Sequence, residues 1–285
     1  MHHMSRASRI ALAVSAAVLA VSLWKYESRP LVPAGPADAT PPETCAGIAA
    51  AAPPTVWLAD LTWEETCAAL AAGFTTALVP TAGTEQNGPH VILCKHHHVV
   101  AATAERLAHE LGDALVAPVV DYVPEERIDP PERHMRWAGT LSVPEPVFEA
   151  VIESAARSLR QHGCTFVAFV GDSGGNQDAQ ARVAARLAGE WGAKSALHVS
   201  DYYAKNGQEA WLVEQGETLA AIGTHAGIRD TSEMLAVHPA GVRVARVAAT
   251  MPESSGVDGD PSRATAARGE EMLRRKVAAA LAQIR

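Results

Sequence analysis

The chain is poor in positive charge and lacks the glycine-rich motifs of nucleotide-binding proteins. Its 24 Lys and Arg are outnumbered by 32 Asp and Glu, which gives a formal net charge of -8, and no basic cluster occurs. A surface that binds nucleic-acid phosphates normally needs a local excess of Lys and Arg, so we expect no nucleic acid partner. Neither G-x-G-x-x-G nor G-x-x-x-x-G-K-[ST] follows an expected strand. A nucleotide site is therefore not expected.

Cysteine is also scarce, and its spacing excludes the common cysteine motifs. The four cysteines are Cys45, Cys67, Cys94 and Cys164, and no two of them form a C-x-x-C pair. This disfavours a zinc ribbon or a thioredoxin-type redox site, and most of these residues are expected to be small buried apolar side chains. In an oxidising compartment Cys45 and Cys67 could form a disulfide, whereas a cytosolic domain would keep them reduced. The sequence leaves this pairing open.

The first residues have the layout of a targeting segment. Arg6 and Arg9 precede an uncharged apolar run, Ile10 to Trp24, and Lys25 follows it. The run of about 15 residues is shorter than the roughly 20 that a spanning helix usually needs, and no small-x-small cleavage site follows it. We therefore interpret residues 1–29 as a signal peptide or a signal anchor. The protein is expected to be exported, either to the periplasm or held at the membrane by this segment alone.

The remainder is expected to form a linker and one α/β domain. Residues 30–54 are rich in Pro, Ala and Gly, a composition that buries too little apolar surface to order itself, so a flexible linker is predicted. In residues 55–285, short apolar runs alternate with longer amphipathic stretches, which is typical of a mainly parallel sheet flanked by helices. The runs are Thr75 to Pro80, His97 to Leu111, Ala114 to Val120, Val147 to His162, Thr165 to Val170, Gln177 to Trp191 and Ala196 to Ser200, with a closing helix in Pro261 to Ile284.

Two polar segments follow expected strands of this sheet. The first is Pro80-Thr-Ala-Gly-Thr-Glu-Gln-Asn-Gly-Pro-His90, and the second is Gly171-Asp-Ser-Gly-Gly-Asn-Gln177. Ligands collect where the strands of an open α/β sheet end, because backbone donors and loop side chains converge there. Carboxylate, imidazole and amide groups can bind a metal or orient its ligands. The two segments together predict a polar pocket.

Five segments, in order, carry a resemblance to one family. They are Gly83-Thr-Glu-Gln-Asn-Gly-Pro-His90, Arg136-Trp-Ala-Gly-Thr-Leu-Ser142, Gly174-Gly-Asn176, Thr224-His-Ala-Gly-Ile-Arg-Asp-Thr-Ser232 and Gly259-Asp-Pro-Ser-Arg-Ala-Thr265 with Gly269. They resemble the creatininase family motifs G-[ST]-x-E-Q-H-G-P-H, R-x-x-G-T-[LI]-S, N-G-H-G-G-N, H-A-G-x-x-E-T-S and G-D-P-x-x-A-T-x-x-x-G. The resemblance implies a three-layer α/β fold, a homo-oligomer and a two-metal site that activates water against an amide.

Several ligand positions of that family differ in this chain. Glu85 matches the first ligand, but Asn87 replaces a ligand His, His96 replaces the bridging Asp, and Ser173 replaces a second ligand His. A bridging carboxylate offers two oxygens to two cations, whereas a neutral imidazole offers one lone pair to one metal. We therefore expect one divalent ion, Zn or Mn, rather than two.

The candidate site residues follow from these positions. Glu85, His96 and Asp172 are predicted to hold the metal. His225 matches a family position that can move a proton to the leaving nitrogen, and Asn176 and Asp230 are predicted to orient the site.

The sequence thus predicts a metal-dependent hydrolase that acts on the C–N amide or cyclic amide bond of a small molecule. Two alternatives stay open. With several ligands replaced, the chain could be a catalytically silent protein that binds a small molecule. It also contains G-x-S-x-G at Gly171 to Gly175, so a serine hydrolase using Ser173 is a further possibility.

Overall fold

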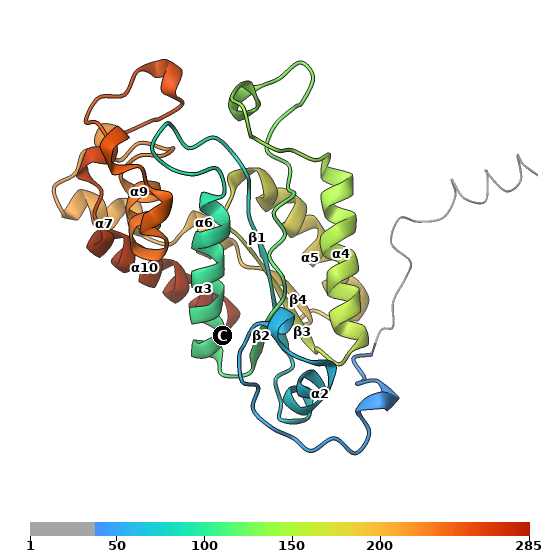
Figure 1. Cartoon of the computed structure of the whole chain (residues 1–285). Coiled ribbons are helices and arrows are strands. Elements are labelled where there is room, and N and C mark those ends of the chain that lie inside the picture. The colour runs from blue at the N-terminus through green and yellow to red at the C-terminus, as the bar shows by residue number, and fades with distance from the viewer. Residues whose placement is uncertain (1–37) are drawn as a thin grey trace, which may run out of the picture. The chain divides into compact units, whose positions relative to one another are not determined.

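The computed structural model describes residues 38–285 (Figure 1), so the predicted targeting segment 1–29 lies outside the described residues. In chain order the main elements are α2 (Trp63–Ala71), β1 (Thr76–Thr81), α3 (Lys95–Leu111), β2 (Ala114–Val116), α4 (Glu145–Gln161), β3 (Phe166–Gly171), α5 (Gln177–Trp191), β4 (Ala196–His198), α6 (Ser200–Ala204), α7 (Gln208–Glu214), α8 (Leu219–Ile222), α9 (Ile228–Val237) and α10 (Ala266–Ile284). Among these residues, no helix combines the length and the apolar character needed to cross a membrane.

The strands form one parallel sheet in the order β2-β1-β3-β4. The central strands β1 and β3 pair along their full length, from Thr76 opposite Phe166 to Thr81 opposite Gly171. Because all four strands run the same way, their carboxyl ends lie at one edge of the sheet. The loops that leave this edge carry the polar segments noted above.

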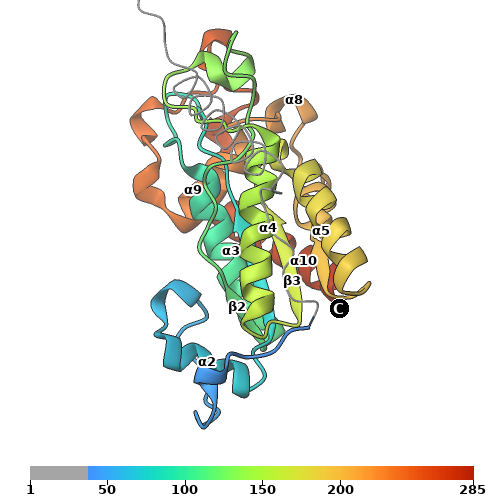
Figure 2. The same cartoon turned by 90° about the vertical axis from the view of Figure 1, so that its right-hand side faces the viewer.

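Helices cover both faces of the sheet, as Figures 1 and 2 show. Strand side chains alternate between the two faces. On one side Ala77, Val79 and Phe169 pack with α4 and α5, and on the other side Leu78 and Val170 pack with α3, α6 and α10. Figure 2 shows α4 and α5 side by side over their face. The expected three-layer α/β fold with a mainly parallel sheet is confirmed.

Several element boundaries differ from the sequence prediction by a few residues, and two of these differences have a local cause. The strand expected from Ala114 to Val120 ends at Val116, because Pro118 has no N–H to continue the ladder, and Val120 returns only as a single bridge to Thr81. The closing helix begins at Ala266 rather than Pro261. Thr265 caps it by accepting a hydrogen bond from the N–H of Arg268.

The structure describes part of the expected linker, and a disulfide attaches this part to α2. Residues 43–45 form a short 3-10 helix, and Cys45 is bonded to Cys67 of α2. The disulfide that the sequence left open is therefore present in the structure. Cys94 and Cys164 are free. The domain limits at residues 29 and 54 stay predictions.

The packing of α10 on α9 generates a stability prediction. Replacing a helical Gly with Ala usually stabilises a protein by about 1 kcal/mol. In α10, however, a Cβ on Gly269 would lie 1.9 Å from the backbone oxygen of Ser232 in α9, whereas a Cβ on Gly189 in α5 meets nothing within 4 Å. We expect Gly269→Ala to lower the free energy of unfolding by about 1–3 kcal/mol and Gly189→Ala to raise it. Urea unfolding of both variants tests this, and equal stabilisation by the two would contradict the packing.

Candidate active site

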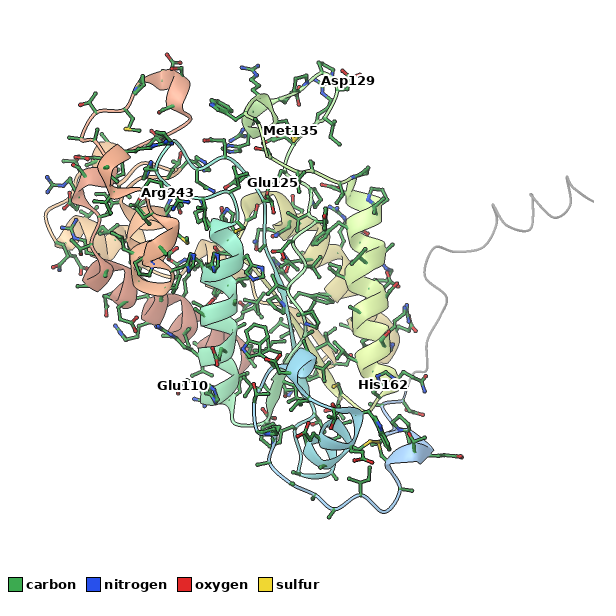
Figure 3. All side chains as sticks on the ribbon, viewed as in Figure 1. Glu110, Glu125, Asp129, Met135, His162 and Arg243 are labelled. Atoms are coloured by element: carbon green, nitrogen blue, oxygen red, sulfur yellow. A yellow bond between two sulfur atoms is a disulfide. The ribbon has the colours of Figure 1, made fainter. Side chains whose placement is uncertain are left out.

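A cavity of about 750 Å³ opens at the carboxyl edge of the sheet. Loops after β1, β2 and β3, the start of α3 and the start of α9 contribute its walls. In Figure 3, Glu125 lies at this end of the domain, whereas Glu110 and His162 lie at the opposite end. The two polar segments predicted from the sequence meet here, so the expected polar pocket exists.

The predicted ligands Glu85, His96 and Asp172 are in direct contact inside this cavity. The Nε2–H of His96 donates to Glu85 Oε1 at 2.8 Å, and its Nδ1–H donates to Asp172 Oδ2 at 2.9 Å. Burial and Lys95 oppose a charge on His96, yet the two carboxylate hydrogen bonds raise the pKa of the ring to about 9. At neutral pH the ring is a buried imidazolium. In this arrangement it has no lone pair for a metal, so the assignment of His96 and Asp172 as ligands stays a prediction.

Two buried lysines extend this contact into a chain of alternating charges. Lys95 Nζ lies 3.4 Å from Glu85 Oε1 and 2.9 Å from Asp230 Oδ2. Lys276 Nζ lies 2.6 Å from Asp172 Oδ1 and 3.1 Å from Glu233 Oε2. In order, the buried charge chain is Asp230, Lys95, Glu85, His96, Asp172, Lys276 and Glu233.

The pKa directions within the buried charge chain follow from these pairings. Burial disfavours each charge, but the adjacent carboxylates keep the pKa of Lys95 and of Lys276 above the usual range for lysine. Burial is likewise overcome at Glu85, chiefly by Lys95, so the pKa of this carboxyl is below its usual range. Lys276 has the same effect on the pKa of Asp172. Three fixed positive charges therefore line the cavity at neutral pH.

Two further histidines face Glu85 from other segments. His225 Nδ1 lies 3.7 Å from Glu85 Oε1, and His134 Nε2 lies 3.7 Å from Glu85 Oε2. Burial, together with the charge of Lys95, lowers the pKa of His225 to about 4. Burial also lowers the pKa of His134. Both rings are neutral near pH 7, which is the form that binds metals.

Gln86 holds both of these rings. Its backbone oxygen accepts from His225 Nε2–H at 2.8 Å, which leaves a lone pair on Nδ1 directed toward Glu85. Such a carbonyl contact commonly orients a metal-binding histidine. The Gln86 side-chain amide donates to His134 Nδ1 at 3.0 Å. Ligation through His134 Nε2 therefore requires the opposite tautomer and a turned amide, whereas His225 needs no rearrangement.

The backbone beside His225 is held in an uncommon conformation. Ala226 has φ 54°, in the left-handed region that residues other than glycine rarely adopt. Its N–H donates to Asp230 Oδ2 at 2.6 Å, and its oxygen lies 3.1 Å from the Nε2 of the buried His90. Asp230 thus contacts the His225 segment and pairs with Lys95, and the orienting role expected for it stays a prediction.

A single divalent ion fits this donor set better than two. Among the described residues, the ligand atoms of Glu85, His134 and His225 lie within 4.8 Å of one another and could hold a metal ion. Carboxylate and imidazole donors suit Zn or Mn. At the family positions for further ligands, the Asn87 amide donates to backbone oxygens, including that of Glu85 at 2.9 Å, and the Ser173 hydroxyl donates to Glu125 Oε1 at 2.9 Å. These groups do not complete a two-metal centre.

Two other residues singled out from the sequence, Asn176 and Ser173, are not part of this donor set. Asn176 is fully buried at the start of α5 and accepts from the Gln177 and Gln180 amides, so it supports the loop after β3 without lining the cavity. Ser173 does line the cavity. Within residues 38–285 it makes no hydrogen bond to a histidine, and a serine nucleophile requires such a base. The geometry therefore does not support the serine hydrolase alternative.

Sequence reasoning missed five residues of the site: Gln86, Lys95, Glu125, His134 and Lys276. Gln86 lies inside the first polar segment, Lys95 lies five positions after its end and directly before His96, and His134 lies two residues before Arg136-Trp-Ala-Gly-Thr-Leu-Ser142. Their position next to motifs was the available signal. Glu125 and Lys276 had no such signal, because only the fold brings them to the cavity.

The comparisons with known proteins show the family and agree with this fold. The family model described as creatinine amidohydrolase matches residues 59–284. The mycofactocin precursor peptide peptidase of Mycolicibacterium smegmatis is 29% identical over 219 residues, which cover 69% of this chain and 78% of that protein.

Solved structures give the same picture at the level of the fold. A structure titled creatininase Mn has a TM-score of 0.66 at 24% identity, covering 81% of this chain and 98% of that one. A mutant creatininase of Zn-Zn type has a TM-score of 0.61 at 24% identity, covering 81% of this chain and 97% of that one. Since the family model matches most of the sequence, this chain belongs to the creatininase family.

Proposed function

We propose that this protein hydrolyses the C–N amide bond of a small molecule or a peptide, with one divalent ion, Zn or Mn, held by Glu85, His134 and His225. The observation that carries this proposal is the convergence of these three donors inside a cavity of about 750 Å³. A cavity of this size suits a small ligand. The peptidase named among the relatives supports an amide or peptide bond as the target.

The residues around the donors fit this chemistry. When bound, such an ion would polarise the amide carbonyl and lower the pKa of a water molecule toward neutrality. Glu85 and His225 are already placed to hold it, because one is an ionised carboxylate and the other a neutral ring with a free Nδ1. Lys95 and His96 are fixed positive charges beside Glu85, and positive charge stabilises the oxyanion that develops when water attacks a carbonyl.

One ion rather than two follows from the protein's own cations. His96 and Lys276 neutralise Asp172, so this carboxylate is not available to a second ion without loss of its buried partners. Breaking a buried ion pair by removing one partner costs roughly 3–5 kcal/mol. A second divalent ion would also be repelled by these two charges.

Metal stoichiometry tests this assignment. We expect the purified protein to bind about one Zn or Mn per chain, measured by elemental mass spectrometry and by calorimetric titration. His225→Ala and Glu85→Gln should abolish binding or weaken it at least 100-fold, because each removes a ligand atom. His109→Ala, at an exposed position of α3, is the matched control and should bind as the unaltered protein does.

His96→Gln separates this ligand set from the one predicted from the sequence. If His96 is a cation next to Glu85 rather than a ligand, its replacement removes a repulsive charge, and the metal should be retained or bound more tightly. Loss of the metal in this variant, with the fold intact by circular dichroism, would instead restore Glu85, His96 and Asp172 as the ligands.

A catalytically silent binding protein is the second candidate function. It is supported by the charged groups that line the cavity without a metal, the cations Lys95, His96 and Lys276 and the carboxylates paired with them, because such groups can bind a small polar molecule. If no divalent ion binds at any tested concentration, the metallohydrolase proposal fails. Binding of a small polar molecule to the metal-free protein would then support this second candidate.

We also propose that the protein is exported. The observation that supports this is the Cys45–Cys67 bond, since disulfides persist in oxidising compartments and are rare in the cytosol. Membrane contact through residues 1–29 and homo-oligomerisation stay predictions of the sequence.

Alkylation of free thiols tests the export proposal. In protein taken from cells without reductant, Cys94 and Cys164 should account for all free thiols after denaturation, and both Cys45 and Cys67 should react only after reduction. Mass spectrometry of the alkylated peptides distinguishes the four sites. Free Cys45 and Cys67 in the isolated protein would argue for a cytosolic location.

A further inference from the structure

Glu125 enters the cavity between the two glycine-containing motifs. A Cβ on Gly83 would lie 1.7 Å from Glu125 Oε1, and a Cβ on Gly175 would lie 2.2 Å from the backbone oxygen of Pro124. Any larger residue at these two positions would therefore displace the Glu125 carboxyl or its backbone. The two motifs leave space for a side chain from a third loop, the one after β2.

Hydrogen bonds hold Glu125 through its backbone N–H and through one of its carboxyl oxygens. Ser173 Oγ donates to Glu125 Oε1 at 2.9 Å, and the Glu125 N–H donates to Ser142 Oγ at 3.1 Å. The residue is only 8% exposed and lines the cavity. Among residues 38–285, Oε2 has no hydrogen-bond partner. The free oxygen is thus available to a ligand.

Charged groups from neighbouring segments set the pKa of Glu125. Burial and then the negative charge of Glu85 raise the pKa of Glu125 to about 7, although His96, Ser173 and Lys95 act in the opposite direction. On its own loop, Glu126 is paired with Arg133 at 3.2 Å. A carboxyl in these surroundings changes its protonation state near neutral pH.

We propose that Glu125 is the catalytic acid–base of this site, an inference that rests on the proposed amide hydrolysis. Glu125 Oε2 takes a proton from the attacking water as the water oxygen bonds to the amide carbon. The C–N bond then breaks with its electron pair on nitrogen, and Oε2 returns the proton to that nitrogen. The products are a carboxylic acid and an amine, and Glu125 ends as the carboxylate with which it began.

Glu125 is thereby given the proton-transfer role that the sequence predicted for His225. His225 Nε2–H is engaged with the backbone oxygen of Gln86, and its Nδ1 faces Glu85. A ring held in this way is suited to bind an ion. Glu125 comes from a different loop and is not one of the proposed metal ligands.

Kinetics of matched variants on amino-acid p-nitroanilides test the role. In Glu125→Gln we expect kcat to fall by about 10²–10⁴-fold, because the proton acceptor is lost, while the Zn or Mn content stays unchanged. Glu132→Gln is the control. It makes the same change in the same loop, outside the cavity lining, and should keep full activity. Unchanged kcat in Glu125→Gln would overturn the catalytic role of Glu125 and would leave the proposed hydrolysis intact.

The pH dependence of kcat in a second variant distinguishes a catalytic role of Glu125 from a purely structural one. Glu125 must be ionised to accept a proton, so kcat of the unaltered protein should rise with pH through the pKa of this carboxyl. The Ser173 hydrogen bond favours the ionised form, so Ser173→Ala should move the midpoint of this rise to higher pH and retain activity. An unmoved midpoint would contradict the assignment. A serine nucleophile would instead require Ser173→Ala to be inactive.

Infrared spectroscopy gives a readout without substrate or metal. In the difference between the metal-free unaltered protein and Glu125→Gln, a protonated carboxyl band should disappear between about pH 6 and pH 8. Full ionisation by pH 5 would overturn the inference. Failure of the proposed function is distinguishable, because it appears as the absence of metal or of hydrolysis in the unaltered protein.

Discussion

The buried charge chain from Asp230 to Glu233 is the constraint on which the rest of this site depends. Its seven members come from the loops after β1 and β3, the start of α3, and from α9 and α10. Six of the seven side chains are less than 10% exposed, Asp230 is 21% exposed, and each charge has its oppositely charged partners within the chain. Because removal of one partner leaves an uncompensated buried charge, at a cost of roughly 3–5 kcal/mol, the five segments are held in one arrangement.

This chain also decides what kind of chemistry the cavity can support. Glu85 is shared, since one side of its carboxylate contacts Lys95 and His96, and the other side faces His134. Asp172 is already paired with His96 and Lys276. The donors that remain for an ion are therefore those around Glu85. Burial and the negative charge of Glu85 raise the pKa of Glu125, which has no cation paired with it. Glu125 also lines the cavity.

The glycines of the motifs act through close approach rather than through flexibility. Gly83 and Gly175 have no unusual requirement for a positive φ, but each lies against the segment that carries Glu125. The motifs thus supply ligands and also the empty space into which a third loop places its carboxyl. In the same way, Gln86 contributes no ligand itself and yet fixes the orientation of both His134 and His225.

The sequence by itself determined the fold class and the location of the pocket, because strand and helix periodicities and the loop motifs are local patterns. It also placed Glu85 correctly in the cavity, since this residue lies within a motif. The partners of Glu85 were decided by the tertiary structure. His134 and His225 are 49 and 140 positions away from it in the numbering, so no spacing rule connects them. The protonation of His96 depends on two carboxylates from different loops, and burial and electrostatic interaction exist only once those loops are brought together.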